Sequence, residues 1–67
     1  MNVSDPMSDR EIWIAAGELN AKLGEMTVEY IFDQFSDVLG NQVAVENWRR
    51  IAAAVDAIND ASARRFS

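Results

Sequence analysis

The 67-residue sequence predicts an all-α fold, a compact three-helix antiparallel bundle. Three segments carry apolar residues at helical spacing, glycines fall between them, and no segment alternates apolar and polar residues as a strand would. The hydrophobic content of 49% suffices for one core, and the length allows one domain at most. We expect a flexible N-terminal tail over 1–7, the bundle over 8–63 with helices over 9–23, 27–39 and 42–63, and a frayed C-terminus over 64–67.

The first helix is predicted by its start and stop signals as well as by its apolar spacing. Ser8 and Glu11 fit a capping box, in which each side chain binds the backbone amide of the other residue. Met7 and Ile12 occupy the positions of a hydrophobic staple, and Gly24 suits a left-handed stop. The apolar stripe consists of Ile12, Ala16, Leu19 and Leu23.

The second helix is predicted from an apolar stripe that ends at the stop signal Gly40. Thr27 fits the N-cap position, and the two phenylalanines of this segment, Phe32 and Phe35, are expected to face inward. The helix is therefore predicted to form the centre of the core. Its apolar residues at 3.6-residue spacing are Val28, Ile31, Phe32, Phe35, Val38 and Leu39.

The third helix follows the Gly40 break, with Asn41 as its N-cap. Glu46–Arg50 and Asp60–Arg64 have the acid-first i,i+4 order that favours ion pairs on a helix surface. The main apolar stripe consists of Ala44, Trp48, Ile51, Val55 and Ile58.

The composition argues against several classes of function. With 11 acidic and 6 basic residues the net charge is −5, which disfavours binding to nucleic-acid backbones or anionic membranes. The absence of Cys and His removes thiol, imidazole and zinc chemistry, so we expect neither an enzyme nor a metal or cofactor site. Residues 1–7 lack the features of a signal peptide, and no apolar run is long enough to span a membrane, so we expect a cytoplasmic protein.

An acidic ridge is the main candidate site, because Glu25, Glu29, Asp33 and Asp37 recur every four residues, three of them on the second helix and Glu25 just before it. Like charges at this spacing repel each other, and no local cation offsets them in the sequence. The spacing of about 6 Å roughly resembles that of phosphates along a nucleic-acid strand. An acidic docking surface therefore stands beside two alternatives, a solvated face that keeps the protein soluble and a divalent-cation site.

The two tryptophans are the next candidates for a binding surface. Trp48 lies on the apolar stripe of the third helix, which predicts a core position. Trp13 stands at the edge of its stripe, where core and surface are equally open. An exposed Trp13 with Ile14 would form an apolar patch suited to a partner or to a homodimer.

Arg49 and Arg50 suggest a second interpretation, a helix-turn-helix with the third helix reading DNA. Glu46 would lie on the presumed reading face, and the strongly negative net charge opposes DNA binding. We expect these arginines to pair with Glu46 or with acids of the neighbouring helix instead.

A resemblance covers most of the chain from Ser8 to Ile58. Its residues are Asp9-Arg10-Glu11-Ile12-Trp13-x-Ala15-Ala16, then Gly24, Leu39-Gly40 and Trp48-Arg49-x-Ile51-x-x-x-Val55-x-x-Ile58. This pattern resembles small uncharacterised proteins of alphaproteobacteria and their phages, although the middle helix here is unusually rich in Phe and acid. The resemblance implies a genomic setting near mobile elements, and no functional residues transfer from it. By analogy, small acidic phage proteins are often inhibitors of host defence, including anti-CRISPR proteins.

The leading hypothesis is a non-enzymatic protein-binding module, most concretely an anti-CRISPR-type inhibitor. It would place the acidic ridge, together with Trp13, on a basic, nucleic-acid-binding surface of a larger partner such as a CRISPR effector component. Two alternatives stay open, a self-associating structural bundle and a DNA-binding regulator that uses Arg49 and Arg50.

Overall fold

The fold of this chain consists of helices, as predicted. The computed structural model describes residues 5–65, with side chains described over 5–61. The elements are α1 (Asp9–Leu23), the short 3₁₀-helix η1 (Gly24–Met26), α2 (Thr27–Asp37) and α3 (Gln42–Arg65). No strand occurs within 5–65, so the all-α prediction is confirmed there. The radius of gyration of 12.1 Å exceeds the value of about 10.9 Å for a compact globular chain of this length. The molecule is correspondingly elongated, with principal extents of 41 × 22 × 16 Å.

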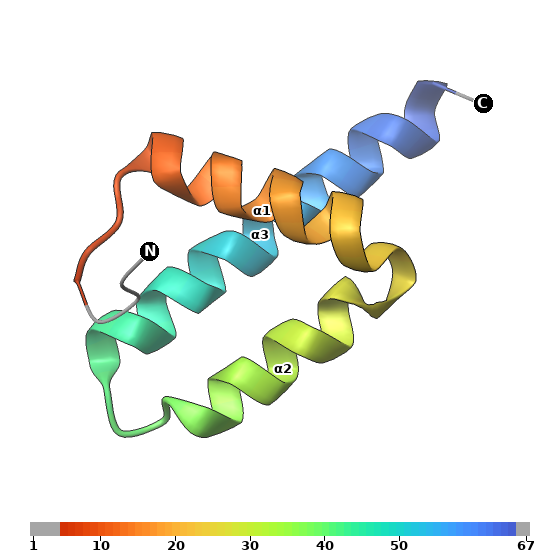
Figure 1. The fold of residues 1–67 in the computed structure, drawn as a ribbon. Helices are drawn as coiled ribbons and strands as arrows, with labels where there is room; N and C mark the ends of the chain where they lie inside the picture. Colours follow the sequence, from red (N-terminus) through yellow and green to blue (C-terminus); the bar gives the residue numbers. More distant parts are fainter. Residues whose placement is uncertain (1–4, 66–67) are drawn as a thin grey trace.

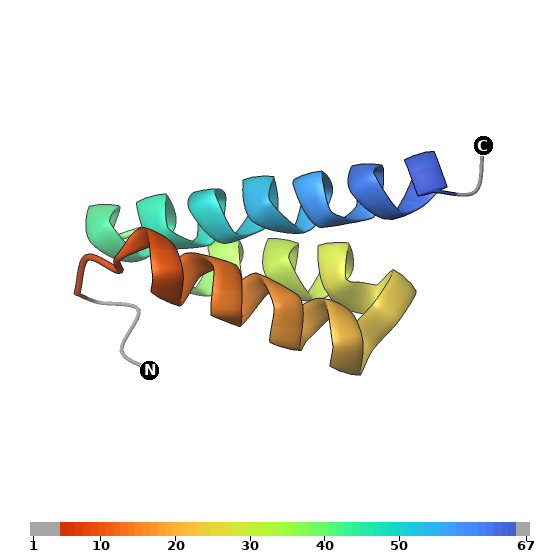
Figure 2. The ribbon, with the colours of Figure 1, turned by 90° about the horizontal axis from the view of Figure 1, so that it is seen from above.

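The predicted three-helix bundle is confirmed only as a packed all-helical fold, because its first two helices are not separate. The elements α1, η1 and α2 follow one another without an intervening loop, so residues 9–37 form one bent helical segment beside α3. Consecutive helices run in opposite directions, and α1 crosses α3 (Figures 1 and 2). α1 contacts α3 more extensively than α2 does. The main interface is therefore between the first and last helices.

The start of α1 has the predicted capping box. The Ser8 hydroxyl accepts a hydrogen bond from the Glu11 amide, and the Glu11 carboxylate accepts one from the Ser8 amide, both at 3.2 Å. At the other end Gly24 has φ 53° and ψ −120°, a conformation that side-chain-bearing residues rarely adopt. The predicted stop at Gly24 is confirmed with a positive φ, although its ψ lies outside the left-handed helical region, and its backbone turns the chain into η1.

Thr27 is not the N-cap of α2, which corrects the prediction. The turn η1 is already helical, so α2 starts without a side-chain cap and Thr27 is its first residue. The Thr27 hydroxyl donates to the carbonyl oxygens of Leu19 (3.2 Å) and Gly24 (2.7 Å), and the residue is buried. Its side chain thus ties α2 to the end of α1.

The core lies mainly between α1 and α3, and the prediction that α2 forms its centre is wrong. Phe32 is 64% exposed and Phe35 is half-buried, whereas Ile31 is buried. Successive helical residues point about 100° apart, so the side of α2 that carries Ile31 turns Phe32 toward solvent. The buried apolar cluster consists of Met7, Ile12, Ala15, Ala16, Ile31, Trp48, Ile51, Ala54 and Val55.

The last two helices differ from the prediction at their ends. α2 stops at Asp37, two residues before the predicted end at 39, and α3 continues to Arg65, beyond the predicted end at 63. The predicted N-cap of α3 is confirmed, since the Asn41 side chain accepts a hydrogen bond from the Ala44 amide at 3.1 Å. The rest of the predicted frayed terminus, residues 66–67, lies outside the described residues.

The predicted ion pair between Glu46 and Arg50 is replaced by two others. Arg49 contacts Glu46 at 3.7 Å, and Arg50 reaches across to Asp9 at the start of α1. Arg50 turns toward α1 because the Met7 carbonyl offers it a second acceptor there. Arg64 of the predicted pair Asp60–Arg64 lies outside the side chains that the structure describes.

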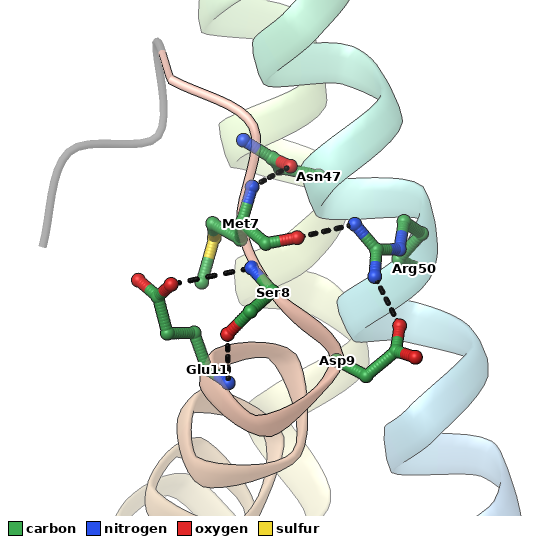
Figure 3. Close-up of polar contacts among 6 residues, drawn as sticks. All are labelled: Met7, Ser8, Asp9, Glu11, Asn47 and Arg50. Atoms are coloured by element: carbon green, nitrogen blue, oxygen red, sulfur yellow. Dashed lines mark hydrogen bonds and ion pairs between the residues drawn. The ribbon is translucent and has the colours of Figure 1, made fainter.

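The segment just before α1 is bound to α3, so the predicted flexible tail over 1–7 does not extend to its last residues (Figure 3). Asn47 accepts from the Met7 amide at 3.2 Å and donates to the Asp5 carbonyl at 2.7 Å. Arg50 donates to the Met7 carbonyl at 2.6 Å and to the Asp9 carboxylate. We call Met7, Asp9, Asn47 and Arg50 the N-terminal clasp. Residues 1–4 lie outside the described part of the chain.

None of the helices described over 5–65 is both long and apolar enough to cross a membrane.

Candidate functional site

The acidic ridge lies on the solvent side of the bent helical segment. Glu25 belongs to η1 and the other three acids to α2, and all four side chains are exposed. None of the four forms an ion pair with a described residue. The four predicted acids therefore follow one another along consecutive turns of η1 and α2, with their charges available to solvent. The ridge members are Glu25, Glu29, Asp33 and Asp37.

Exposed apolar side chains border the acidic ridge on both sides of α2. Val28 and Phe32, 51% and 64% exposed, lie on the side that faces α3. On the other flank of the ridge, Met26 and Tyr30 line a shallow hollow of about 360 Å³, and the Tyr30 ring also packs against Trp48 of α3. The remaining lining residues of this hollow are Leu23, Glu29 and Asp33. α2 thus presents carboxylates next to exposed apolar surface. This combination is typical of surfaces that bind other proteins.

An apolar groove of about 350 Å³ runs between α2 and α3. We call it the α2–α3 groove. The α2 wall contributes its phenylalanines and Val28, and the α3 wall contributes mainly small side chains. The lining residues are Val28, Ile31, Phe32, Phe35, Ala52, Ala53, Val55, Asp56 and Asn59.

Trp13 is exposed, which resolves the position that the sequence left open. It is 51% exposed and its neighbour Ile14 is 48% exposed. Trp13 lines a hollow of about 280 Å³ between α1 and α3, together with Arg50 and the alanines Ala53, Ala54 and Ala57 among others. This hollow shares no lining residue with the hollow beside the acidic ridge. The structure therefore does not bring Trp13 to the ridge residues.

Trp48 is buried, as predicted, with 7% of its surface exposed. Its ring meets the ring of Tyr30 edge-on, with a centroid distance of 6.0 Å and an interplanar angle of 72°. The indole Nε1 is buried without a hydrogen-bond partner. Packing in the buried cluster and against the Tyr30 ring therefore holds Trp48 in place.

The two arginines of the helix-turn-helix interpretation are both engaged with acids, as expected. Arg49 contacts Glu46 on the surface of α3, where both side chains are largely exposed. Arg50 belongs to the N-terminal clasp, and its side chain is 32% exposed. A base-reading role would require Arg50 to leave the Met7 carbonyl and the Asp9 carboxylate.

The described acids are not arranged as metal ligands. Within the described residues no group of three or more Asp or Glu side chains converges as a metal site would require. The ridge carboxylates follow one another along a helix instead of surrounding a point.

Two features of the surface were missed by the sequence reasoning. The exposure of Val28 and Phe32 could not be predicted from the sequence. Apolar spacing defines a stripe on a helix, but it does not show how much of that stripe a neighbouring helix covers. The clasp had one signal: Asn47 is a polar residue four positions before Ile51, inside the apolar stripe of α3. A polar residue at a buried position needs partners, and here they are the backbone groups of Asp5 and Met7.

No protein-family model, curated protein sequence or solved structure matches this chain. The resemblance to small phage proteins remains an expectation from the sequence.

Proposed function

We propose that this chain is a protein-binding module that docks the acidic ridge on a basic surface of a larger partner. One observation carries the proposal: four aligned carboxylates are exposed and form no ion pair with any described residue, although they repel one another. The predicted three-helix antiparallel bundle is the scaffold that presents them. Complementary charge on a partner would convert this repulsion into attraction during association.

The most concrete version is a phage-type inhibitor of host defence, similar in action to anti-CRISPR proteins. Carboxylates one helical turn apart repeat at about 6 Å, close to the phosphate spacing of a nucleic-acid strand. A basic groove on the partner protein that normally binds nucleic acid would then bind the acidic ridge instead of the nucleic acid. A CRISPR effector component in the cytoplasm is a partner of this kind.

The charge-reversing substitution Asp33→Lys tests the proposal. Purified CRISPR effector complexes with their guide RNAs serve as probes, and target-DNA binding is measured with and without the protein. We expect the wild-type chain to inhibit, inhibition to weaken as salt rises, and Asp33→Lys to abolish it. Circular dichroism checks that the helices remain.

Glu18→Lys is the matched control, because Glu18 is an exposed acid of α1 outside the ridge. Both substitutions change the net charge by the same amount, so a general charge effect would appear in both. Unchanged inhibition by Asp33→Lys would contradict the acidic-ridge mechanism. The same loss in both variants would assign the effect to net charge alone.

A self-associating structural bundle is the second candidate, and one observation favours it. Trp13 and Ile14 are adjacent in sequence and each about half exposed. Sedimentation equilibrium over a concentration series tests this alternative, with Trp13→Ala as the variant. A dimer that Trp13→Ala dissociates would support it, and a monomer at all concentrations would exclude it.

A further inference from the structure

We infer that the α2–α3 groove is the seat of a basic amphipathic helix that belongs to the partner protein. The inference rests on the proposed function and deepens it, since it names the chemistry of the partner's contact segment. Three properties of the groove lead to it: its apolar floor, its length between two helices and the charge around it.

The floor of the groove is apolar and open to solvent. Phe32 and Val28 on α2 are more than half exposed beside it. On the α3 side Ala52 and Ala53 keep the wall low, because alanine has no side chain beyond its methyl group. The volume of about 350 Å³ lies at the lower end of the range of ligand pockets. Apolar side chains inserted from a partner would remove this surface from water.

The shape of the groove favours a helix as the occupant. Its lining runs from Val28 to Phe35 on α2 and from Ala52 to Asn59 on α3, which corresponds to about 10 Å along each helix. Two helices that run in opposite directions form its walls (Figure 1). An amphipathic helix binds in such a groove with anchors at i, i+4 and i+7. A partner strand could not bind by extending a sheet, because residues 5–65 contain no strand.

The charge around the groove requires basic residues on the occupant. Asp56 lies in the groove, and Glu29 and Asp33 immediately follow Val28 and Phe32 along α2. No Lys or Arg is among the described lining residues.

The nearest base along the same face of α3, Arg49, is paired with Glu46. Lys or Arg side chains flanking the apolar face of a bound helix would meet the carboxylates of the groove and the ridge.

The same charges disfavour a second copy of this chain in the groove. A symmetric dimer places the same surface patch on both subunits, so Asp56 and the ridge acids of each copy would face those of the other. The net charge of −5 adds repulsion between the copies.

A synthetic peptide serves as the probe, with Leu at i, i+3, i+4 and i+7 and Lys at the other positions of an amphipathic helix. Binding is measured by titration calorimetry, and the site is mapped by backbone amide NMR shifts. We expect shifts at Val28, Phe32, Ala53 and Asp56. A peptide of the same composition in scrambled order, without an apolar face, should bind at least about tenfold more weakly.

Phe32→Ala is the variant that removes the groove's largest exposed side chain, and we expect it to weaken peptide binding about tenfold or more. Leu39→Ala is the matched control, because Leu39 is 73% exposed and does not line the groove. Both substitutions truncate exposed apolar side chains, so both variants should keep the fold.

The outcomes separate this inference from the proposed function. If Asp33→Lys weakens peptide binding and Phe32→Ala does not, the acidic ridge is supported as the binding surface. The assignment of the α2–α3 groove as the helix-binding site is then wrong. If neither salt nor Asp33→Lys affects peptide binding, the proposed docking through the acidic ridge is contradicted. The proposal of a basic helix in the groove is contradicted by the same result. NMR shifts centred on Trp13 would also overturn the inference, because they would place the peptide outside the groove. A dimer that Phe32→Ala dissociates would overturn it as well, because the groove would then bind a second copy of this chain.

Discussion

The side chain of Asn47 fixes the backbone that leads into α1. It is 2% exposed, and its amide group both accepts from the Met7 amide and donates to the Asp5 carbonyl. Arg50 adds a hydrogen bond to the Met7 carbonyl. These contacts allow Met7 to be buried in the core although it precedes the first helix. One polar residue near the start of α3 therefore adds to the core a residue 40 positions earlier in the chain.

We predict that Asn47→Ala lowers the free energy of unfolding by about 1–3 kcal/mol, because the substitution leaves the Met7 amide without its acceptor. Asn59→Ala is the control, since Asn59 is an exposed residue of the same helix. It should change stability by no more than about 0.5 kcal/mol. Urea unfolding followed by circular dichroism measures both. Equal effects would mean that the hydrogen bonds of Asn47 contribute nothing to stability.

At the scale of the elements, the bend between α1 and α2 depends on one backbone conformation. Gly24 has φ 53° and ψ −120°, and the chain returns from it directly into η1 and α2. The Thr27 hydroxyl donates to the Gly24 carbonyl and holds the bend from the other side. The direction of α2, and with it the position of the acidic ridge, follows from this turn.

We predict that Gly24→Ala destabilises the fold by about 1–3 kcal/mol, the cost of holding a side-chain-bearing residue in this conformation. Gly17→Ala should have the opposite effect. Gly17 lies inside α1, and an added Cβ would meet nothing within 4 Å, so alanine should stabilise by about 0.8–1 kcal/mol. Thermal unfolding distinguishes the two. Unchanged stability of Gly24→Ala would contradict the assignment of the bend to the Gly24 conformation.

The elements also show what the sequence could and could not predict. The capping box of α1 and the cap at Asn41 were predictable, because their partners lie three residues apart. The N-cap role of Thr27 was not, because the helical turn η1 replaces the expected break and changes what the hydroxyl contacts. The acidic ridge was predictable from its period, whereas the outward position of Phe32 depends on how little of α2 is covered by α1 and α3.

At the scale of the whole molecule, the packing is uneven. α1 and α3 supply most of the buried cluster, and α2 supplies Ile31 and the buried Thr27. The surface left on α2 carries both the acidic ridge and the α2–α3 groove. The least covered helix is therefore also the one proposed to bind.

We predict that α2 opens locally before the rest of the fold, because few of its side chains are buried. Native-state hydrogen exchange should show amides near Ile31 exchanging at least about tenfold faster than those near Ala16 and Ile51. A bound partner helix should slow the exchange of α2 selectively. Uniform protection across the three helices would show instead that the molecule opens as a single unit.

The N-terminal clasp has a consequence for the order of events during synthesis. Its hydrogen bonds join positions 40 to 43 residues apart, and Met7 can be buried only after Asn47 and Arg50 have been translated. On the ribosome α1 therefore emerges with its apolar face uncovered, and it stays uncovered until the first half of α3 has left the exit tunnel. Once Asn47 and Arg50 are available, the chain buries Met7 and covers the apolar face of α1 in the same step.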